Sequence, residues 1–115
     1  MEEKQFYTDP DTGGRKELKQ CDISSIDPVA LWMLGKVAGY GASKYGHNNY
    51  VKGYPWHLSY AALQRHLMQF WSGADIDEES GQPHLAHAAW HCLALLSFLM
   101  HGNGTDDRPI NSIRE

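Results

Sequence analysis

The 115-residue sequence is poor in cysteine and shows little imbalance of charge. Its two cysteines, Cys21 and Cys92, have neither CxxC nor zinc-finger spacing, which argues against a disulfide framework and a structural zinc site. Cys92 lies among Leu and Ala, so we expect it to be a small buried hydrophobe. The formal net charge of −4 offers no basic stripe, which argues against duplex nucleic acid as a partner.

Long apolar runs are also missing. No stretch approaches the length of a membrane span, and the N-terminal MEEKQFYTDP is too acidic and polar for a signal peptide. The composition, 42% hydrophobic and 21% charged, is that of one globular domain with a single core. We therefore expect a soluble, cytoplasmic protein without a membrane partner. The negative net charge does not argue against small anionic ligands, because a basic pocket can lie on an acidic protein.

Hydrophobic periodicity predicts three main helices. Asp27 and Pro28 suit the N-cap and first position of one helix, which Gly46 is expected to end. The second helix is predicted over about 58–72 and the third over about 83–101, each followed by glycine. The apolar stripes expected to be buried are Val29, Trp32, Met33, Val37 and Tyr40, then Tyr60, Leu63, Leu67, Phe70 and Trp71, then Leu85, Ala88, Cys92, Leu95, Leu96 and Leu99.

No convincing alternating strand is present, so the predicted fold is all-α, a small bundle of three to four helices. Stripes this apolar would be buried better against another chain, and we expect oligomerisation to complete the bundle, most simply as a homodimer. Residues 1–24 are predicted to be an N-terminal arm, 25–102 the helical domain that carries the candidate site, and 103–115 a polar, mobile tail.

The stretch PHLAHAAWH places three histidines within about 60° of one another on a helix. They border the leucine stripe and should project into a seam between helices, where His66 of the second helix and the acidic loop join them. Imidazole and carboxylate groups together can bind a divalent metal, and an imidazole can act as a general base. The predicted metal ligands are His66, Asp75, Asp77, His84, His87 and His91, and the predicted catalytic residues are His66, Asp75 and His87.

Other readings of these residues are weaker or remain open. The acidic loop is not an EF-hand, because Ala86 stands where a bidentate Glu is required, and HExxH is absent. The alternative hypothesis is that the histidines only satisfy buried hydrogen bonds in a purely structural bundle.

The segment SKYGHNNYVKGYPW combines aromatic rings, amides and cations, as a purine pocket does. Lys44 is predicted to meet phosphates, Tyr45 and Trp56 to stack on a base, and Asn49 to read its edge. The alternative is that these rings cover one end of the bundle. Two further phosphate contacts are predicted at Lys16, in the basic patch of the arm, and at Arg65, which faces solvent unless a ligand docks there.

The run from YGASKYGHNNY to HLAHAAWH, with TGGRK before it, resembles the phage dATP/dGTP diphosphohydrolases over residues 12–100. Its most specific pieces are KYG…N, RH, SG.D.D.ESG and HLAHAAWH. The resemblance implies a phage enzyme that cleaves a purine deoxynucleoside triphosphate to the monophosphate and pyrophosphate. It also implies a relation to the all-α MazG-like pyrophosphohydrolases, which use magnesium or manganese.

The sequence departs from the MazG-like pattern of carboxylates, ExxE and then ExxD. Gln64, Arg65 and His66, then His84 and His87, stand in the equivalent places. A histidine-rich site suits zinc, manganese or nickel better than magnesium, which prefers oxygen ligands. Two functions follow: a pyrophosphohydrolase dependent on Mg, Mn or Zn, or a non-catalytic oligomeric sponge for a nucleotide or cyclic-nucleotide immune signal. In both, the partner is a small purine nucleotide.

Overall fold

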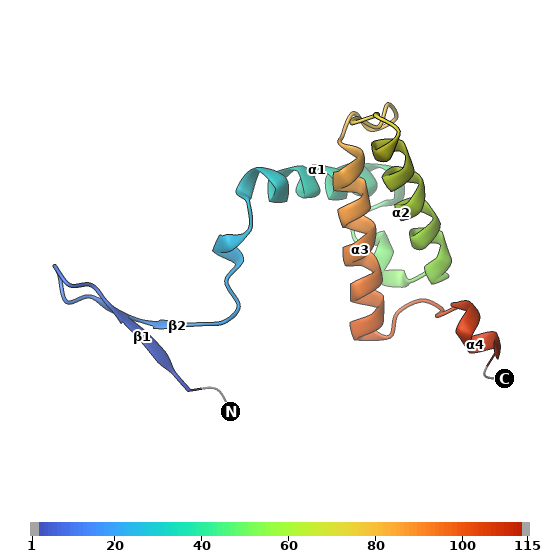
Figure 1. The fold of residues 1–115 in the computed structure, drawn as a ribbon. Coiled ribbons are helices and arrows are strands. Elements are labelled where there is room, and N and C mark those ends of the chain that lie inside the picture. The colour runs from blue at the N-terminus through green and yellow to red at the C-terminus, as the bar shows by residue number, and fades with distance from the viewer. Residues whose placement is uncertain (1–2, 114–115) are drawn as a thin grey trace.

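The computed structural model describes residues 3–113 and is mostly helical, which confirms the predicted fold class. α2 and α3 form an antiparallel hairpin, and α1 crosses it (Figure 1). In chain order the elements are β1 (Gln5–Thr8), β2 (Arg15–Leu18), the short 3-10 helix η1 (Ile23–Ser25), α1 (Pro28–Tyr45), a second 3-10 helix η2 (Asn49–Lys52), α2 (Trp56–Trp71), α3 (His84–His101) and α4 (Pro109–Ile113).

Local chemistry sets the ends of the helices close to where they are predicted. The Asp27 carboxylate accepts hydrogen bonds from the backbone N–H groups of Val29 and Ala30, which caps α1. Gly46, with φ +95°, ends that helix in a conformation that favours glycine. Gly102, with φ +75°, ends α3 in the same way, and its N–H donates to the Phe98 carbonyl. Among the described residues, no helix is both long and apolar enough to cross a membrane.

The N-terminal arm contains a β-hairpin, so the prediction of no strand was wrong. β1 and β2 pair antiparallel from Gln5 opposite Leu18 to Thr8 opposite Arg15. The Asp9 carboxylate accepts from the backbone N–H groups of two turn residues, and Gly13 supplies the positive φ that the turn needs. Both strands lie away from the helical body (Figure 1), so neither needs the alternating apolar pattern by which strands are recognised.

Residues 103–107, at the start of the predicted C-terminal tail, are hydrogen-bonded to the start of α2. The indole N–H of Trp56 donates to the Asn103 carbonyl at 2.9 Å, and its backbone N–H donates to Thr105 at 3.0 Å. A Cβ added at Gly53 would lie 2.4 Å from the backbone nitrogen of Gly104, so glycine is needed for this close approach. The tail then ends in α4.

The predicted apolar stripes are largely exposed, which corrects the expectation that they form the core. On α3, Leu85, Leu96 and Leu99 are 46–56% exposed, and Cys92 is exposed as well. On α2, Trp71 is 89% exposed. Periodicity shows that a helix has an apolar face but not that a neighbour covers it. The described core consists of Val37, Ala62, Ala86, Ala88, Ala94 and Phe98, with Ser59, His84 and His87 buried among them.

Candidate metal and nucleotide site

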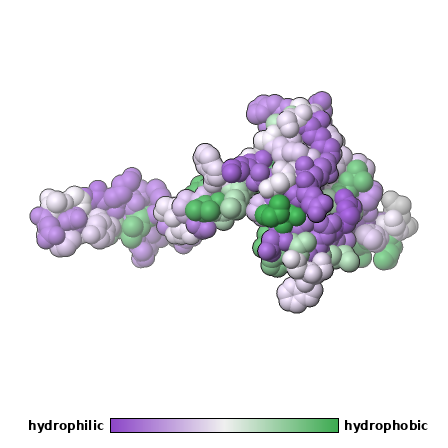
Figure 2. All heavy atoms as spheres, turned by 90° about the horizontal axis from the view of Figure 1, so that it is seen from above, coloured by the Kyte–Doolittle hydropathy of each residue, from purple (hydrophilic) through white to green (hydrophobic). Residues whose placement is uncertain are grey.

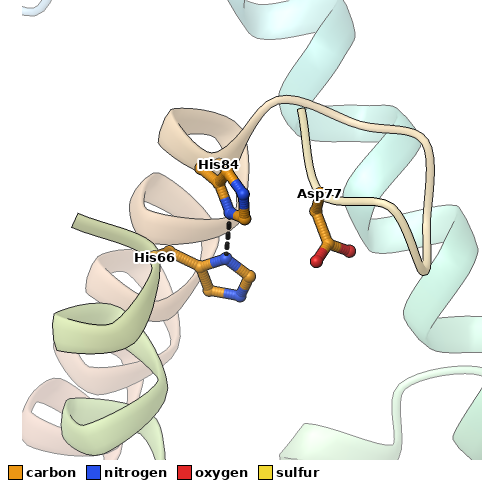
Figure 3. Close-up of side chains that lie close together, drawn as sticks. All are labelled: His66, Asp77 and His84. Atoms are coloured by element: carbon orange, nitrogen blue, oxygen red, sulfur yellow. Dashed lines mark hydrogen bonds between the residues drawn. The ribbon is translucent and has the colours of Figure 1, made fainter. Parts of the chain in front are cut away.

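Three side chains from different segments meet beside the top of α3. His66 comes from α2, His84 from the first turn of α3, and Asp77 from the loop between the two helices (Figure 3). One potential ligand atom of each lies within 4.8 Å of the others, and Nδ1 of His66 is 2.9 Å from Nδ1 of His84. The hairpin connection therefore brings together residues that are 7 to 18 positions apart.

The donor set fits a divalent transition metal. Two imidazole nitrogens and one carboxylate oxygen are the ligands that zinc and manganese accept, and three protein ligands leave positions for water or substrate. The facing ring nitrogens of His66 and His84, 2.9 Å apart, are close enough that both could bind one ion. Without a metal, one imidazole donates its N–H to the other.

The loop before α3 holds Asp77 in place through its own hydrogen bonds. The Asp77 carboxylate accepts the backbone N–H of Ser80 at 3.0 Å and its hydroxyl at 2.8 Å. The Asp77 carbonyl accepts the N–H of Gly81, whose φ of +74° allows the tight turn. Burial alone would raise the pKa of Asp77, but the two bonds from Ser80 outweigh it and lower the pKa, so the carboxylate is ionised.

The remaining histidines extend the cluster along α3. The ring of His66 stacks on that of His87, with centroids 4.5 Å apart, and faces His91 at 6.1 Å. The single hydroxyl hydrogen of Ser80 goes to Asp77, so Ser80 Oγ accepts from His87 Nε2, 2.6 Å away. That bond puts the proton of His87 on Nε2 and leaves Nδ1 with a free lone pair.

Burial keeps these imidazoles neutral at physiological pH. Desolvation lowers the pKa of His66 and His87, and it lowers the pKa of His91 to about 4. His91 Nδ1 also lies 3.0 Å from the hydroxyl of Ser59, a fully buried residue that Tyr54 contacts at 2.6 Å. Neutral imidazoles have the lone pairs that metal binding and general-base catalysis require.

A cavity of about 700 Å³ opens beside the cluster, between α1, α2 and α3. Its volume lies within the usual range for small-molecule sites. Its wall combines polar side chains, among them His66, Asp77 and His87, with aromatic rings. The aromatic lining residues are Tyr40, Tyr45, Tyr50, Tyr54 and Trp90, of which Tyr50 and Trp90 pack edge to face at 5.9 Å. The cavity thus offers both apolar surface and polar groups to a ligand.

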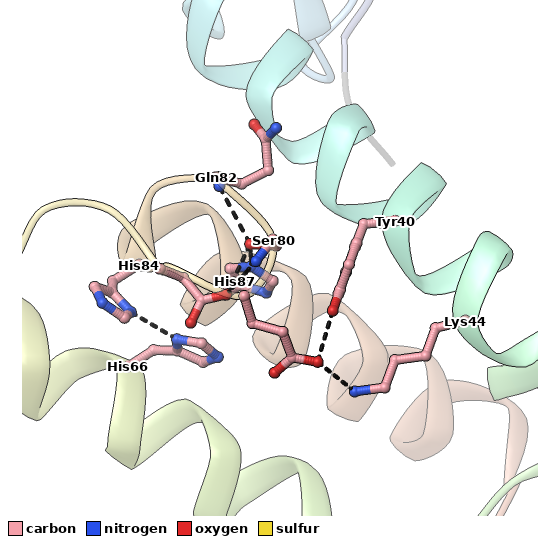
Figure 4. A network of polar contacts seen from close by, with 9 residues as sticks. Tyr40, Lys44, His66, Ser80, Gln82, His84 and His87 are labelled. Carbon is pink, nitrogen blue, oxygen red and sulfur yellow. Dashed lines mark hydrogen bonds and ion pairs between the residues drawn. The ribbon is translucent and has the colours of Figure 1, made fainter.

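Side chains on two helices contribute positive charge to the cavity wall. Lys44 of α1 donates to Glu79 Oε1 at 2.9 Å, and the Tyr40 hydroxyl donates to the same oxygen at 2.7 Å (Figure 4). Both hydrogen bonds lower the pKa of Glu79. Arg65 of α2, which is exposed, also lines the cavity. An anionic ligand would meet Arg65 directly and would compete with Glu79 for Lys44.

Most of the predicted site residues gather in this one place. The cavity wall includes Lys44, Tyr45, Asn49, Arg65, His66, Asp77, His87 and His91, and His84 completes the cluster behind it. Asp75 does not join them: its side chain is exposed, and only its carbonyl contributes, by accepting the His84 N–H. Trp56 lies under the C-terminal tail, and Lys16 is on β2, away from the cavity.

Several residues of the site were not among the predicted ones. Glu79, Ser80, Tyr40 and Trp90 all touch the cluster or line the cavity. Ser80 and Glu79 stand within three residues of Asp77 in DEES, so their proximity was readable from the sequence. Tyr40 lies 39 residues from Glu79, and only the crossing of α1 over the hairpin brings the two together.

Comparison with known proteins identifies the family of this chain. The chain belongs to the family described as dATP/dGTP diphosphohydrolase, N-terminal, which matches residues 10–108. A dATP/dGTP diphosphohydrolase of Salmonella phage PMBT28 is 30% identical over 97 residues, which are 84% of this chain and 33% of that protein. The chain therefore spans about a third of this curated relative. No solved structure matches the chain.

Proposed function

We propose that the cavity binds a purine deoxynucleoside triphosphate and that the protein hydrolyses it to the monophosphate and pyrophosphate. The observation that carries the proposal is the joining of a His66–Asp77–His84 cluster to a cavity with an aromatic and a cationic wall. Family membership supports the same chemistry, because the relative is named for it. In the reaction, water supplies the oxygen that joins the α-phosphorus, and the bond to the bridging oxygen of the β-phosphate breaks.

The cluster would hold a divalent metal, with manganese or zinc favoured over magnesium by the two imidazoles. Such an ion would polarise the phosphate and lower the pKa of a bound water. Around it, the chain's own groups bind and orient the substrate. Arg65 and Lys44 are proposed to neutralise phosphate charge, while Tyr45 and Asn49 bind the base. His87, which is neutral and hydrogen-bonded to Ser80, is proposed to accept a proton from water.

A second function is favoured by the scarcity of carboxylate in the cluster. Asp77 is its single carboxylate among the described residues, and the second acid at the cavity, Glu79, is already engaged by Lys44 and Tyr40. Phosphoryl-transfer sites that use magnesium depend on oxygen ligands. The alternative is therefore a binder that holds an intact nucleotide or cyclic-nucleotide signal, as a sponge would.

The experiment that tests the proposal combines activity with recovery of ligand. Purified chain without a histidine tag is incubated with each of the four deoxynucleoside triphosphates and with Mg, Mn or Zn, and pyrophosphate release is measured. Each mixture is then denatured and its nucleotide analysed by chromatography. We expect release from dATP or dGTP. Recovery of intact, bound nucleotide with no pyrophosphate would favour the binder, and no binding at all would reject both functions.

A matched pair of variants tests the cluster. Asp77→Asn removes the clustered carboxylate, whereas Asp75→Asn removes an exposed one two residues away. We expect Asp77→Asn to lower kcat/KM by about 100-fold or more, the usual scale for losing a group that acts on the reacting charge, with Asp75→Asn close to wild type. Equal effects of the two variants would contradict the proposed site.

A further inference from the structure

The side of the α2–α3 hairpin that faces away from the cavity is an uncovered apolar surface. We call it the back face: Tyr60, Leu67 and Trp71 of α2 with Leu85, Cys92, Leu96 and Leu99 of α3. Each of these side chains is exposed. Leu96 is nine residues from His87 and Trp71 is nine from Ala62, so each is turned by about 180° from a residue that lines the cavity. The back face is independent of the proposed catalytic site.

The solvent-accessible surface of this chain is larger than that of a compact monomer of the same mass. A compact monomer of 13.0 kDa exposes about 6,300 Å². This chain exposes 9123 Å², and its radius of gyration is 19.0 Å against about 13 Å for a compact domain of this length. The β1–β2 hairpin, which projects from the helical body, contributes to this excess. The excess as a whole is larger than the roughly 800 Å² that each partner buries in a stable association.

The lack of charge on the back face favours a second copy of this chain as its partner. α3 contains no Asp, Glu, Lys or Arg from end to end, and Arg65, the one such residue of α2, lies on the cavity side. Two back faces related by a two-fold axis would meet without like-charge repulsion, so the surface is complementary to itself. Two helical hairpins packed in this way make a four-helix bundle, which is a stable architecture. Figure 2 shows hydrophobic residues exposed at the surface of the helical body.

We infer that the back face binds a second copy of this chain, so that the protein is a dimer in which the α2–α3 hairpins form a four-helix bundle. The predicted apolar stripes of α2 and α3 would then be buried in the core of the dimer and not in the core of one chain. The two cavities open on opposite outer sides of the bundle. Cys92, exposed in one chain, becomes buried between the two.

The test measures mass and thiol access on the full chain. Light scattering after size-exclusion chromatography should give twice the 13.0 kDa of one chain. Leu96→Glu should give a monomer that keeps its helical circular dichroism. Ile113→Glu, a matched change at an exposed apolar residue of α4, should stay dimeric.

Thiol labelling provides a measurement that needs no substitution. In wild-type protein, Cys92 should react with iodoacetamide about tenfold or more slowly than Cys21, because a thiol in a dry interface is inaccessible. Dilution to the monomer should abolish the difference. A monomeric wild type overturns the inference, whether Cys92 is reactive or is shielded by another segment. A dimer with a freely reactive Cys92, or one that survives Leu96→Glu, also overturns it, because the contact would then lie elsewhere.

Discussion

The cavity side of the α2–α3 hairpin contains histidines and is largely buried, whereas its back face contains leucines and aromatic rings and is exposed. On α3, His84 is 1% exposed and Leu96 is 52% exposed. Burying imidazoles costs free energy unless each has a hydrogen-bond partner. Here His66 pairs with His84, His87 with Ser80, and His91 with Ser59. No fully buried side-chain polar atom in the described part of the chain lacks a partner.

The contrast supports the two proposals, that the polar side binds a ligand and that the apolar side packs against a second chain. A leucine in place of His84 would pack without the need for a partner, so stability alone does not explain a column of imidazoles. Exposed leucines are unfavourable in water, and burying them against another surface would be favourable. Each face can therefore be changed by substitution without changing the other. Changes on the polar side should affect ligand binding, and changes on the apolar side should affect association.

The largest expected effect is on stability, from Phe98→Ala. Phe98 is fully buried and packs edge to face on Tyr54 at 5.1 Å. Its loss should lower the free energy of unfolding by about 3–5 kcal/mol, as for other buried aromatics. Leu99→Ala, one position along but on the back face, should cost about 1 kcal/mol or less in the monomeric Leu96→Glu background. Urea denaturation measures both, and equal losses would show that the two faces do not differ.

The second largest effect is expected from acidification, which should lower the free energy of unfolding because it protonates buried histidines. Unfolded histidine takes up its proton near pH 6.5, but folded His91 does so only near pH 4, so the unfolded state gains stability across that window. The free energy of unfolding should fall by about 1–2 kcal/mol from pH 7 to pH 4.5, with part of the effect screened by water. Urea denaturation with chelator present measures it.

Matched variants identify the group responsible for the pH dependence. His91→Gln should flatten the decline, whereas His101→Gln, at an exposed end of α3, should leave it unchanged. Stability that rises on acidification would contradict the burial of neutral imidazoles.

Removal of the Ser80 hydroxyl should weaken metal binding without unfolding the chain. Ser80 bridges Asp77 and His87, so Ser80→Ala frees both side chains to turn. Metal affinity should fall by about tenfold, the scale found for groups that orient metal ligands. Ser72→Ala, which loses only a hydroxyl bond to the Gln69 carbonyl, serves as the control. Calorimetric titration with Zn or Mn is the measurement, and unchanged affinity in both variants would mean that Ser80 does not orient the ligands.

The smallest effect is expected from Lys44→Ala. The Lys44–Glu79 pair is exposed, so its loss should change stability little. Nucleotide affinity should fall by about threefold to tenfold, and the difference should shrink as salt is added. Lys36→Ala, on α1 but outside the cavity wall, is the matched control. Calorimetry at two salt concentrations tests this, and a loss that is independent of salt would argue against a phosphate contact.

Local chemistry made several elements predictable. Asp27 and Pro28 predict the start of α1, and Gly46 and Gly102 predict the ends of α1 and α3. These ends are predictable because helix caps depend on residues that are close in the sequence. The histidine column on α3 is likewise a matter of helical spacing. By contrast, Asp75 and Asp77 look equivalent in the sequence. The turn closed by Gly81 directs only Asp77 at the histidines.

The sequence by itself determined where the helices run, which residues share a helical face, and which family the chain belongs to. Tertiary structure decided which of the two faces each helix turns inward, and it brought Tyr40 and Lys44 of α1 to Glu79 of the loop. The physical reason is that periodicity is a property of one helix, whereas burial depends on contacts between segments far apart in the chain. α3 has two plausible inner faces, and its packing on α1 and α2 buries the one that carries the histidines.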